Sequence, residues 1–439
     1  MLGPFSLAVI ALISTGIVDT IYLGRLTDEA RPDLAIMALA ALTIGFPLTF
    51  MGNSANIGLG AGTMSAVSRA LGQGDKEKAE RHAAAAILMG LTVMGALVAF
   101  MMLCIPLFIK VTGASEAVSE MATGYLLITL PGLIVLSVAS MSNNILRAYG
   151  EAALPSSIMI LGAVINIILD PFFIFGWGPF PRMEVQGAAL ATLSGNVIAA
   201  IYALYIVAIR RKVIDFADMT IASIRNAWSI IGQVGLPAAG TNIIVPVATF
   251  AAVSIIGLTL GEADVAAFGV ASRAELISVG LLYALSACIG AITGRNGGAG
   301  QTDRVREAFK VSYWICFVWG TLMAIVLAVF AKQIAGVFTN DQMLIDKIIP
   351  YFYIVPITIF AYGFVFVSAA GLNAIGRPIY GLIYTIIRSL VLYVGLIFIG
   401  VQMAGLVGAF VGVAAANLIS GIVAIVWTMK RVPMTARES

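Results

Sequence analysis

The chain has 439 residues, of which 60% are hydrophobic and only 11% are charged, and its mean hydropathy is +1.02. Because a soluble domain carries about 25% charged residues, this composition excludes an ordinary soluble protein and indicates an integral membrane protein. The formal net charge of +3 is small, and it gives no reason to expect a nucleic-acid partner.

Hydrophobic stretches of about 20 residues recur along the chain, and each is long enough to cross roughly 30 Å of hydrocarbon. They predict twelve transmembrane helices, over residues 4–26, 35–58, 83–108, 118–141, 156–177, 185–209, 232–258, 264–292, 309–331, 348–371, 379–401 and 403–429. The first stretch has no basic residue before it and contains an aspartate, which is not typical of a cleavable signal peptide. The predicted fold class is therefore all-α and integral to the membrane.

The loops between these stretches differ in charge. Loops on one side carry 17 lysine and arginine residues, whereas loops on the other side carry six. Cytoplasmic loops collect Lys and Arg, so the basic side is predicted to be cytoplasmic. Because the number of spans is even, both termini lie on this same side. The sequence therefore predicts a multi-pass protein of the plasma or inner membrane with both termini in the cytoplasm.

The sequence also contains an internal repeat. The matching pairs are VSRALGQGD (67–75) with TGRNGGAGQ (293–301), SNNILRAYG (142–150) with SAAGLNAIG (368–376), and GAALATLSGN (187–196) with GAFVGVAAAN (408–417). The offset is 226 residues for the first two pairs and 221 for the third. Two copies of six spans in the same orientation are related by a pseudo-twofold axis along the membrane normal.

This repeat predicts the domain organisation. We expect an amino-terminal six-helix lobe over 1–209, a cytoplasmic linker over 210–230 and a carboxy-terminal six-helix lobe over 231–439. Transporters of this design bind their substrate between or within the two halves and rock the halves around it.

Two carboxylates, Asp19 and Asp170, lie in the middle of the first and fifth predicted spans. A carboxylate at bilayer depth is costly, so such residues usually face a cavity or a partner and mark an ion or proton path. Asn166 lies four residues before Asp170, and Thr192 lies four residues before Asn196, so each pair shares a helix face. Oxygen ligands suit Na⁺, while a desolvated carboxylate can instead carry H⁺. The alternative is that Asn166, Thr192 and Asn196 are hydrogen-bonding groups that hold helices together.

The two halves differ in these positions. At the offset of 226 residues, Asp19 corresponds to Val245 and Asp170 to Leu396, so the acidic pair predicts a site in the amino-terminal half only. Asn143, at the end of the fourth span, either faces a substrate cavity or caps a helix, and Asn196 is the other candidate for that cavity.

A second polar group lies in the carboxy-terminal half. Arg273 and Glu275 lie within the eighth predicted span, and Arg388 lies within the eleventh. These three residues are either a structural or gating group or a second functional site. One hypothesis is that Arg388 meets Glu275 across this half.

Six segments in order resemble one family of transporters. They are VDTIYLGRL in the first span, VSRALGQGDKEKA after the second, LRAYGEAALP after the fourth, NIILDPFFIFG in the fifth, GAALAT in the sixth and GRNGGAGQTDRV after the eighth. On twelve spans with a six-plus-six repeat, this set resembles the multidrug and toxic compound extrusion (MATE) transporters over nearly the whole chain.

The resemblance implies a secondary antiporter that exports bulky, often cationic organic compounds in exchange for H⁺ or Na⁺. It implies that Asp19, Asn166, Asp170 and Thr192 form an amino-lobe site for that cation, Na⁺ included, and that Pro4 marks a bend in the first helix. The seventh span has no acidic residue in GLPAAGTNIIVPVATF, so the chain is similar to the amino-lobe, DinF-like branch.

Further expectations follow from the resemblance. The partners are small organic compounds and the lipid bilayer, the protein is a monomer, and it needs no cofactor beyond the coupling ion. Two alternatives remain. One is a lipid-linked oligosaccharide flippase of the same superfamily, which usually lines its cavity with Arg and Lys, whereas the buried charges of this amino-terminal half are acidic. The other is an integral-membrane enzyme, which needs clustered catalytic residues near an interface, and the sequence has no such cluster.

Overall fold

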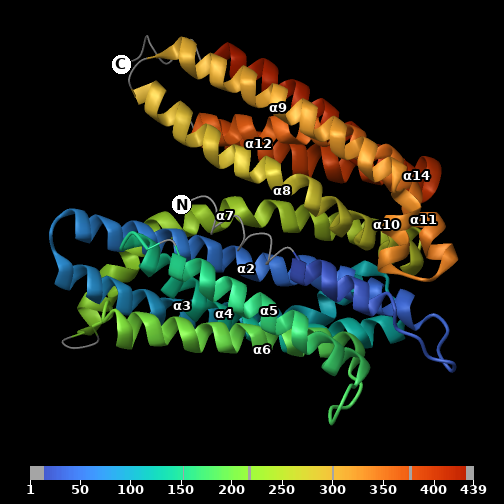
Figure 1. Ribbon diagram of the computed structural model, residues 1–439, viewed down its shortest axis with the longest axis horizontal. Coiled ribbons are helices and arrows are strands. Elements are labelled where there is room, and N and C mark those ends of the chain that lie inside the picture. The colour runs from blue at the N-terminus through green and yellow to red at the C-terminus, as the bar shows by residue number, and fades with distance from the viewer. Residues whose placement is uncertain (1–13, 152, 216–218, 299–300, 375–377, 432–439) are drawn as a thin grey trace. The chain divides into compact units, whose positions relative to one another are not determined.

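The computed structural model describes residues 14–151, 153–215, 219–298, 301–374 and 378–431, and within these ranges it contains helices and loops but no strand (Figure 1). The first predicted span is helical over residues 14–23, and Pro4 lies outside the described residues. The helices that follow are α2 (Leu34–Gly72), α3 (Lys76–Thr112), α4 (Glu116–Ala148), α5 (Ala153–Phe175), α6 (Glu184–Leu204), η1 (Tyr205–Arg210), α7 (Ile221–Thr259), α8 (Glu262–Gly298), α9 (Thr302–Val329), α10 (Ala331–Phe338), α11 (Gln342–Ile354), η2 (Pro356–Thr358), α12 (Ile359–Ala374), α13 (Pro378–Ile386), η3 (Ile387–Tyr393) and α14 (Val394–Arg431).

The chain divides into two compact units, Met1–Pro246 and Val247–Ser439. The division falls inside α7, directly after Pro246, so this one helix contributes to both units. The lobe and linker boundaries expected from the repeat, at 1–209, 210–230 and 231–439, stay a prediction.

In the first unit, α4 lies at the centre of the packing. It contacts α2, α3, α5 and α6, and α5 packs along α6. Figure 1 shows α3, α4, α5 and α6 running alongside one another. The interior is built from small and aliphatic side chains such as Ala38, Ala84 and Leu126, all fully buried. Small residues let membrane helices approach closely, and close packing drives their association where lipid is as apolar as leucine.

In the second unit, α12 has the central place and packs against α8, α9, α13 and α14. The helix before it is interrupted, because Pro356 begins the short 3-10 segment η2 between α11 and α12. Proline lacks an N–H and clashes with the preceding turn, which accounts for the break. The tenth predicted span, 348–371, therefore consists of two helices joined by a kink rather than one.

Nine segments of the described chain are long and apolar enough to cross a membrane. One of them, Tyr380–Lys430, holds two spans, since Ala404 and Gly405 within it have non-helical backbone angles. With α8, which carries Arg273 and Glu275, eleven of the twelve predicted spans correspond to described helices, and the first span is described only over residues 14–23. Several helices run beyond their predicted ends; α2 continues to Gly72, because hydropathy marks the hydrocarbon rather than the end of a helix.

The loop after the first helix is tied to the start of α6. Arg31 forms salt bridges with Asp28, at 2.9 Å, and with Glu184, the first residue of α6. Arg182 donates a hydrogen bond to the carbonyl oxygen of Thr27 at 3.1 Å. These contacts hold the end of the first helix beside α6 in the first unit.

Candidate functional site

The two membrane carboxylates lie together in the first unit. Asp19, on the helix over residues 14–23, is 7% exposed, and Asp170, on α5, is fully buried. Their carboxyl groups are close enough to interact electrostatically and to share a hydrogen bond. Two carboxylates in a low-dielectric interior repel each other when both are ionised, so the pair is more stable with a proton or a cation between them.

Asn166 connects this pair to the next helix. Its side-chain Nδ2 donates to Asp170 Oδ1 at 3.4 Å on the same helix and to Thr192 Oγ1 at 3.2 Å on α6. The four-residue spacing of Asn166 and Asp170 therefore does place both groups on one face of α5. The structure brings all four residues predicted for the cation site, including Thr192, into one cluster.

The closeness of α5 and α6 depends on glycine. A Cβ atom built on Gly195 of α6 would lie 2.5 Å from the carbonyl oxygen of Gly162 on α5. A Cβ on Gly187 would lie 2.5 Å from the carbonyl group of Phe173. No larger residue fits at either contact without moving the backbone, so these glycines hold Asn166 within reach of Thr192.

An aromatic contact fixes the first helix beside α5. Tyr22 packs edge-on against Phe175, with ring centroids 5.7 Å apart, and Phe175 stacks on Trp177 at 6.0 Å. Tyr22 lies three residues after Asp19 and therefore on the same side of its helix. The contact turns that side, and Asp19 with it, toward α5.

The cluster offers oxygen atoms and has no internal counter-charge. Asn166 Oδ1 and Asp170 Oδ2 are buried and form no hydrogen bond within the described part of the chain. Among the described residues, the charged group that acts on Asp170 is Asp19, another acid. Buried polar atoms are normally satisfied, so these oxygens are suited to a bound Na⁺, whose ligands are oxygens, or to a proton on one carboxyl group.

The two cavity candidates stand apart from this cluster. Asn143 is buried in α4, and its Oδ1 forms no hydrogen bond to any described residue. Asn196 is half-buried on α6, one turn beyond Thr192. Neither is hydrogen-bonded to the four clustered residues in the part of the chain that is described.

The second unit contains a cluster of the opposite charge. Arg388, on η3, is 8% exposed, and its guanidinium carbon lies 3.5 Å from the ring centre of Tyr362. Its Nη2 donates to Asn417 Oδ1 at 3.0 Å, and Asn417 Nδ2 donates to Thr358 Oγ1 at 3.2 Å. Arg388 Nε is buried and forms no hydrogen bond within the described residues.

Glu275 has a partner that the sequence did not suggest. It accepts a hydrogen bond from the hydroxyl of Tyr351 on α11, and Arg388 acts on it only through space. The two residues form no salt bridge in the described chain, so they do not meet as the direct pair that the sequence suggested. Arg273 is buried on the same helix as Glu275.

Sequence reasoning missed three members of this cluster. Tyr351, Tyr362 and Thr358 stand in apolar stretches without a spacing that marks them. Asn417 did carry a signal, because the repeat aligns it with Asn196. Equivalent spans of the two halves thus hold an acidic cluster in one unit and a guanidinium in the other.

Comparison with known proteins decides the family. The sequence matches the MatE family over residues 4–172 and 237–399, one stretch in each half of the chain. The chain belongs to the MatE family. It is a membrane transporter whose twelve transmembrane helices form two six-helix lobes.

Relatives of this MatE transporter differ in their named substrates. An "FAD transporter" of Shewanella oneidensis is 31% identical over 419 residues, covering 95% of this chain and 91% of that protein. A probable multidrug resistance protein of Bacillus subtilis is 24% identical over 319 residues, covering 70% of this chain and 67% of that protein. Among solved structures, the inward-facing conformation of a multidrug resistance MATE transporter has a TM-score of 0.89 at 26% identity, with 98% of this chain and 99% of that chain covered.

Proposed function

We propose that this MatE transporter is a secondary antiporter that exports small organic compounds in exchange for H⁺ or Na⁺. The coupling ion binds at Asp19, Asn166, Asp170 and Thr192. The observation that carries the proposal is the contact of two buried carboxyl groups, Asp19 and Asp170, where no positive side chain of the described residues acts on Asp170. Such a pair changes its net charge when an ion arrives, and that change is what coupling requires.

The exchange proceeds by competition. The empty acidic pair favours the substrate-binding form of the amino-terminal lobe, and ion entry neutralises the pair and favours release. Pro171 follows Asp170 directly and cannot donate a backbone hydrogen bond, so α5 has a place to bend near the ion. A membrane potential of 100 mV contributes roughly 2.3 kcal/mol for each unit charge moved fully across, enough for a tens-fold gradient.

Two substrate classes compete. Organic cations are the first candidate, because the buried charges of the amino-terminal unit are acidic and a related protein is named for multidrug resistance. An anionic flavin nucleotide is the second. It is favoured by the FAD transporter relative and by Arg388, whose buried guanidinium forms no salt bridge in the described chain. The flippase alternative has no such support.

The remaining assignments complete the proposal. The lobes extend over 1–209 and 231–439, joined by a cytoplasmic linker at 210–230. The protein acts as a monomer in the plasma or inner membrane with both termini in the cytoplasm. Asn143 and Asn196 line the substrate cavity, and no cofactor other than the coupling ion takes part.

The test is transport by the purified protein in proteoliposomes. Gradients of H⁺ and Na⁺ are imposed separately, and a cationic dye and FAD are followed as substrates. Either the H⁺ or the Na⁺ gradient should drive transport of either the dye or FAD. Asp170→Asn should abolish the part of the transport that depends on the gradient. Asp303→Asn is the matched control, because Asp303 is an exposed carboxylate at the start of α9. Full gradient-driven transport by Asp170→Asn would refute the proposed site.

Arg388→Gln separates the two substrate classes. Glutamine removes the charge and keeps a group that can donate to Asn417. If FAD is the substrate, this variant should lose FAD transport. If organic cations are the substrate, dye transport should stay near the wild-type rate.

A further inference from the structure

One transmembrane helix, α7, runs from the first unit into the second. Its residues up to Pro246 pack in the first unit, and its residues from Val247 onward pack in the second. The repeat predicts that 231–246 belong to the carboxy-terminal lobe, yet this segment packs with the first unit. The chain therefore passes from one unit to the other inside a membrane helix and not in the polar segment 210–230.

Glycines hold the first part of α7 tightly against α2. A Cβ atom built on Gly58 of α2 would lie 2.6 Å from the Cβ of Ala239, and one built on Gly62 would overlap a backbone carbonyl group of α7. The two glycines are four residues apart, the spacing with which membrane helices approach closely. Trp228 of α7 also donates from Nε1 to the carbonyl oxygen of Ala85 on α3 at 2.9 Å. These contacts fix the first part of α7 to the first unit.

The backbone hydrogen bonds of α7 are interrupted where the helix leaves the first unit. Proline has no N–H, so Pro246 cannot donate to the carbonyl oxygen of Asn242, four residues earlier. That oxygen accepts instead from the hydroxyl of Ser54 on α2, at 3.1 Å. Ser54 is 1% exposed, and it shares its one hydroxyl hydrogen with the carbonyl oxygen of Phe50 at 3.0 Å. A side chain of the first unit thus takes the place of the missing donor.

This interruption makes α7 easy to bend at one position. Sharp kinks in helices occur where a proline removes a hydrogen bond and crowds the preceding turn. A bend at Pro246 leaves the Ser54 contact intact, because Asn242 precedes the proline and is held by the first unit. Beyond the proline α7 is anchored again, since Ala252 and Ile256 are fully buried within the second unit.

We propose that Pro246 is the hinge about which the two lobes move during transport. The part of α7 before Pro246 moves with the first unit, the part after it moves with the second, and Ser54 holds the last free carbonyl before the hinge. Hinges are a few residues that absorb a change in backbone angles, and a helix that lacks one hydrogen bond absorbs that change at low cost. The inference rests on the proposed function, because such a transporter rocks its two halves around the bound substrate.

The substitution Pro246→Ala tests the hinge. Alanine supplies the missing N–H, so α7 becomes a continuous helix and must break a hydrogen bond whenever it bends. The rate of gradient-driven transport in proteoliposomes should fall about tenfold, the effect of one backbone hydrogen bond on a rate. Substrate affinity of the purified protein should stay at the wild-type value, since no binding group changes. Pro237→Ala is the matched control, because it makes the same exchange earlier in α7, where both sides belong to the first unit.

A double substitution tests the part played by Ser54. Ser54→Ala leaves the Asn242 carbonyl oxygen without this donor and should lower the Tm of the purified protein. In the Pro246→Ala protein the N–H of the new alanine satisfies that oxygen, so adding Ser54→Ala should change the Tm much less. Equal Tm changes from Ser54→Ala in the two proteins would overturn the assignment of Ser54 as the replacement donor.

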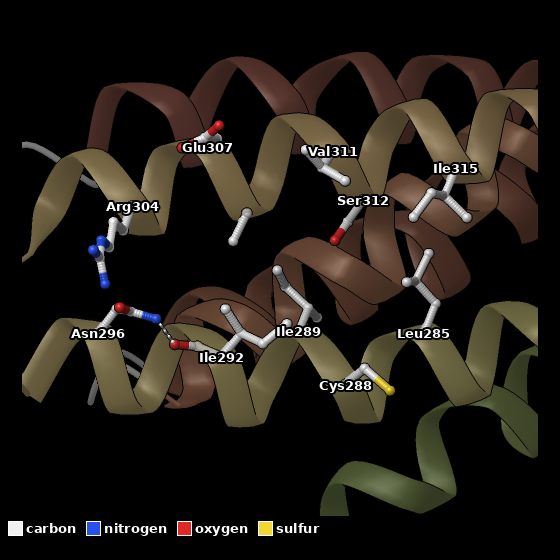
Figure 2. A pocket seen from close by; sticks show the side chains of 11 residues that line it. Leu285, Cys288, Ile289, Ile292, Asn296, Arg304, Glu307, Val311, Ser312 and Ile315 are labelled. Atoms are coloured by element: carbon white, nitrogen blue, oxygen red, sulfur yellow. Dashed lines mark hydrogen bonds between the residues drawn. The ribbon is translucent and has the colours of Figure 1, made fainter.

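Distances between spin labels give a second readout that does not depend on transport. Cysteines at Gln73 in the first unit and at Glu307 in the second, both exposed, carry the labels in a full-length protein whose native cysteines are replaced by alanine. Figure 2 shows the Glu307 carboxylate directed away from α8, so a label at this position stays out of the groove between α8 and α9. The control pair is Glu307 with the exposed Met343, because both residues belong to the second unit.

The label distances separate the hinge from the proposed function. In the wild type, the distance from Gln73 to Glu307 should change when Na⁺ is added or the pH is lowered, and the distance from Glu307 to Met343 should not. In Pro246→Ala the first distance should stay fixed. A wild type without gradient-driven transport would refute the proposed function, and the label distances would then decide the hinge. Wild-type transport and wild-type distance changes in Pro246→Ala would overturn the hinge, as would a first distance that never changes in the wild type.

Discussion

Replacing Gly195 with alanine should uncouple transport without unfolding the protein. The new Cβ would lie 2.5 Å from the carbonyl oxygen of Gly162, whereas ordinary contact begins at 3.4 Å, so α5 and α6 must separate there by about 0.9 Å. The Asn166–Thr192 hydrogen bond, 3.2 Å long, would then exceed 4 Å and break. Losing one interhelical hydrogen bond in a membrane protein costs about 0.6–2 kcal/mol, which is small beside the stability of the whole.

The effect on coupling should be larger than the effect on stability. The site must hold its groups to within about 0.5 Å to bind an ion selectively, so a displacement near 1 Å should weaken ion binding tenfold or more. The measurement is ion-driven efflux from proteoliposomes, together with the concentration of the coupling ion at half-maximal rate. Gly95→Ala on α3 is the matched control, because its Cβ would meet nothing within 4 Å. Wild-type ion dependence in Gly195→Ala would show that the close approach of α5 and α6 does not form the site.

Three further outcomes are expected. Single cysteines at Lys76 and Arg211 should resist an impermeant thiol reagent applied outside intact cells, and labelling from outside would reverse the topology. Tyr351→Phe leaves the half-buried Glu275 carboxylate without its donor and should cost roughly 0.5–1.5 kcal/mol, read as a lower Tm; an unchanged Tm would contradict that hydrogen bond. The hydrogen bond from Arg31 lowers the pKa of Asp28 below 3.8, so the contact stabilises the fold at neutral pH and is lost as the pH falls through that lowered value. At pH values below that pKa, the small Tm difference between wild type and Asp28→Asn should vanish. A Tm difference that persists would contradict this role of the Arg31–Asp28 contact.

The fold was predictable because a bilayer permits few structures. Every backbone group of a spanning segment must be satisfied internally, so hydrophobic stretches of sufficient length become helices. Even the narrow gap between the last two predicted spans, 379–401 and 403–429, corresponds to the break at Ala404 and Gly405. The interruption at Pro356 was missed, since hydropathy does not fall there and only the proline marks it.

The candidate site was predictable only in part. Asn166 and Asp170 share a helix face through their spacing, which the sequence displays. Their contact with Asp19 and Thr192 depends on how the helices pack. That packing is set by contacts such as Gly195 with Gly162, which no local sequence pattern predicts. The Tyr351–Glu275 contact was not predicted for the same reason. The two residues are far apart in sequence, and neither has a polar residue at helical spacing that marks it.

Binding of the substrate to the purified protein, measured as a function of Na⁺ and pH, tests the antiport proposal most directly. If ion binding at the acidic pair favours substrate release, substrate affinity of the wild type should fall as Na⁺ rises or as the pH drops. In the Asp19→Asn/Asp170→Asn protein that fall should disappear. Wild-type affinity that is independent of both ions would contradict the account.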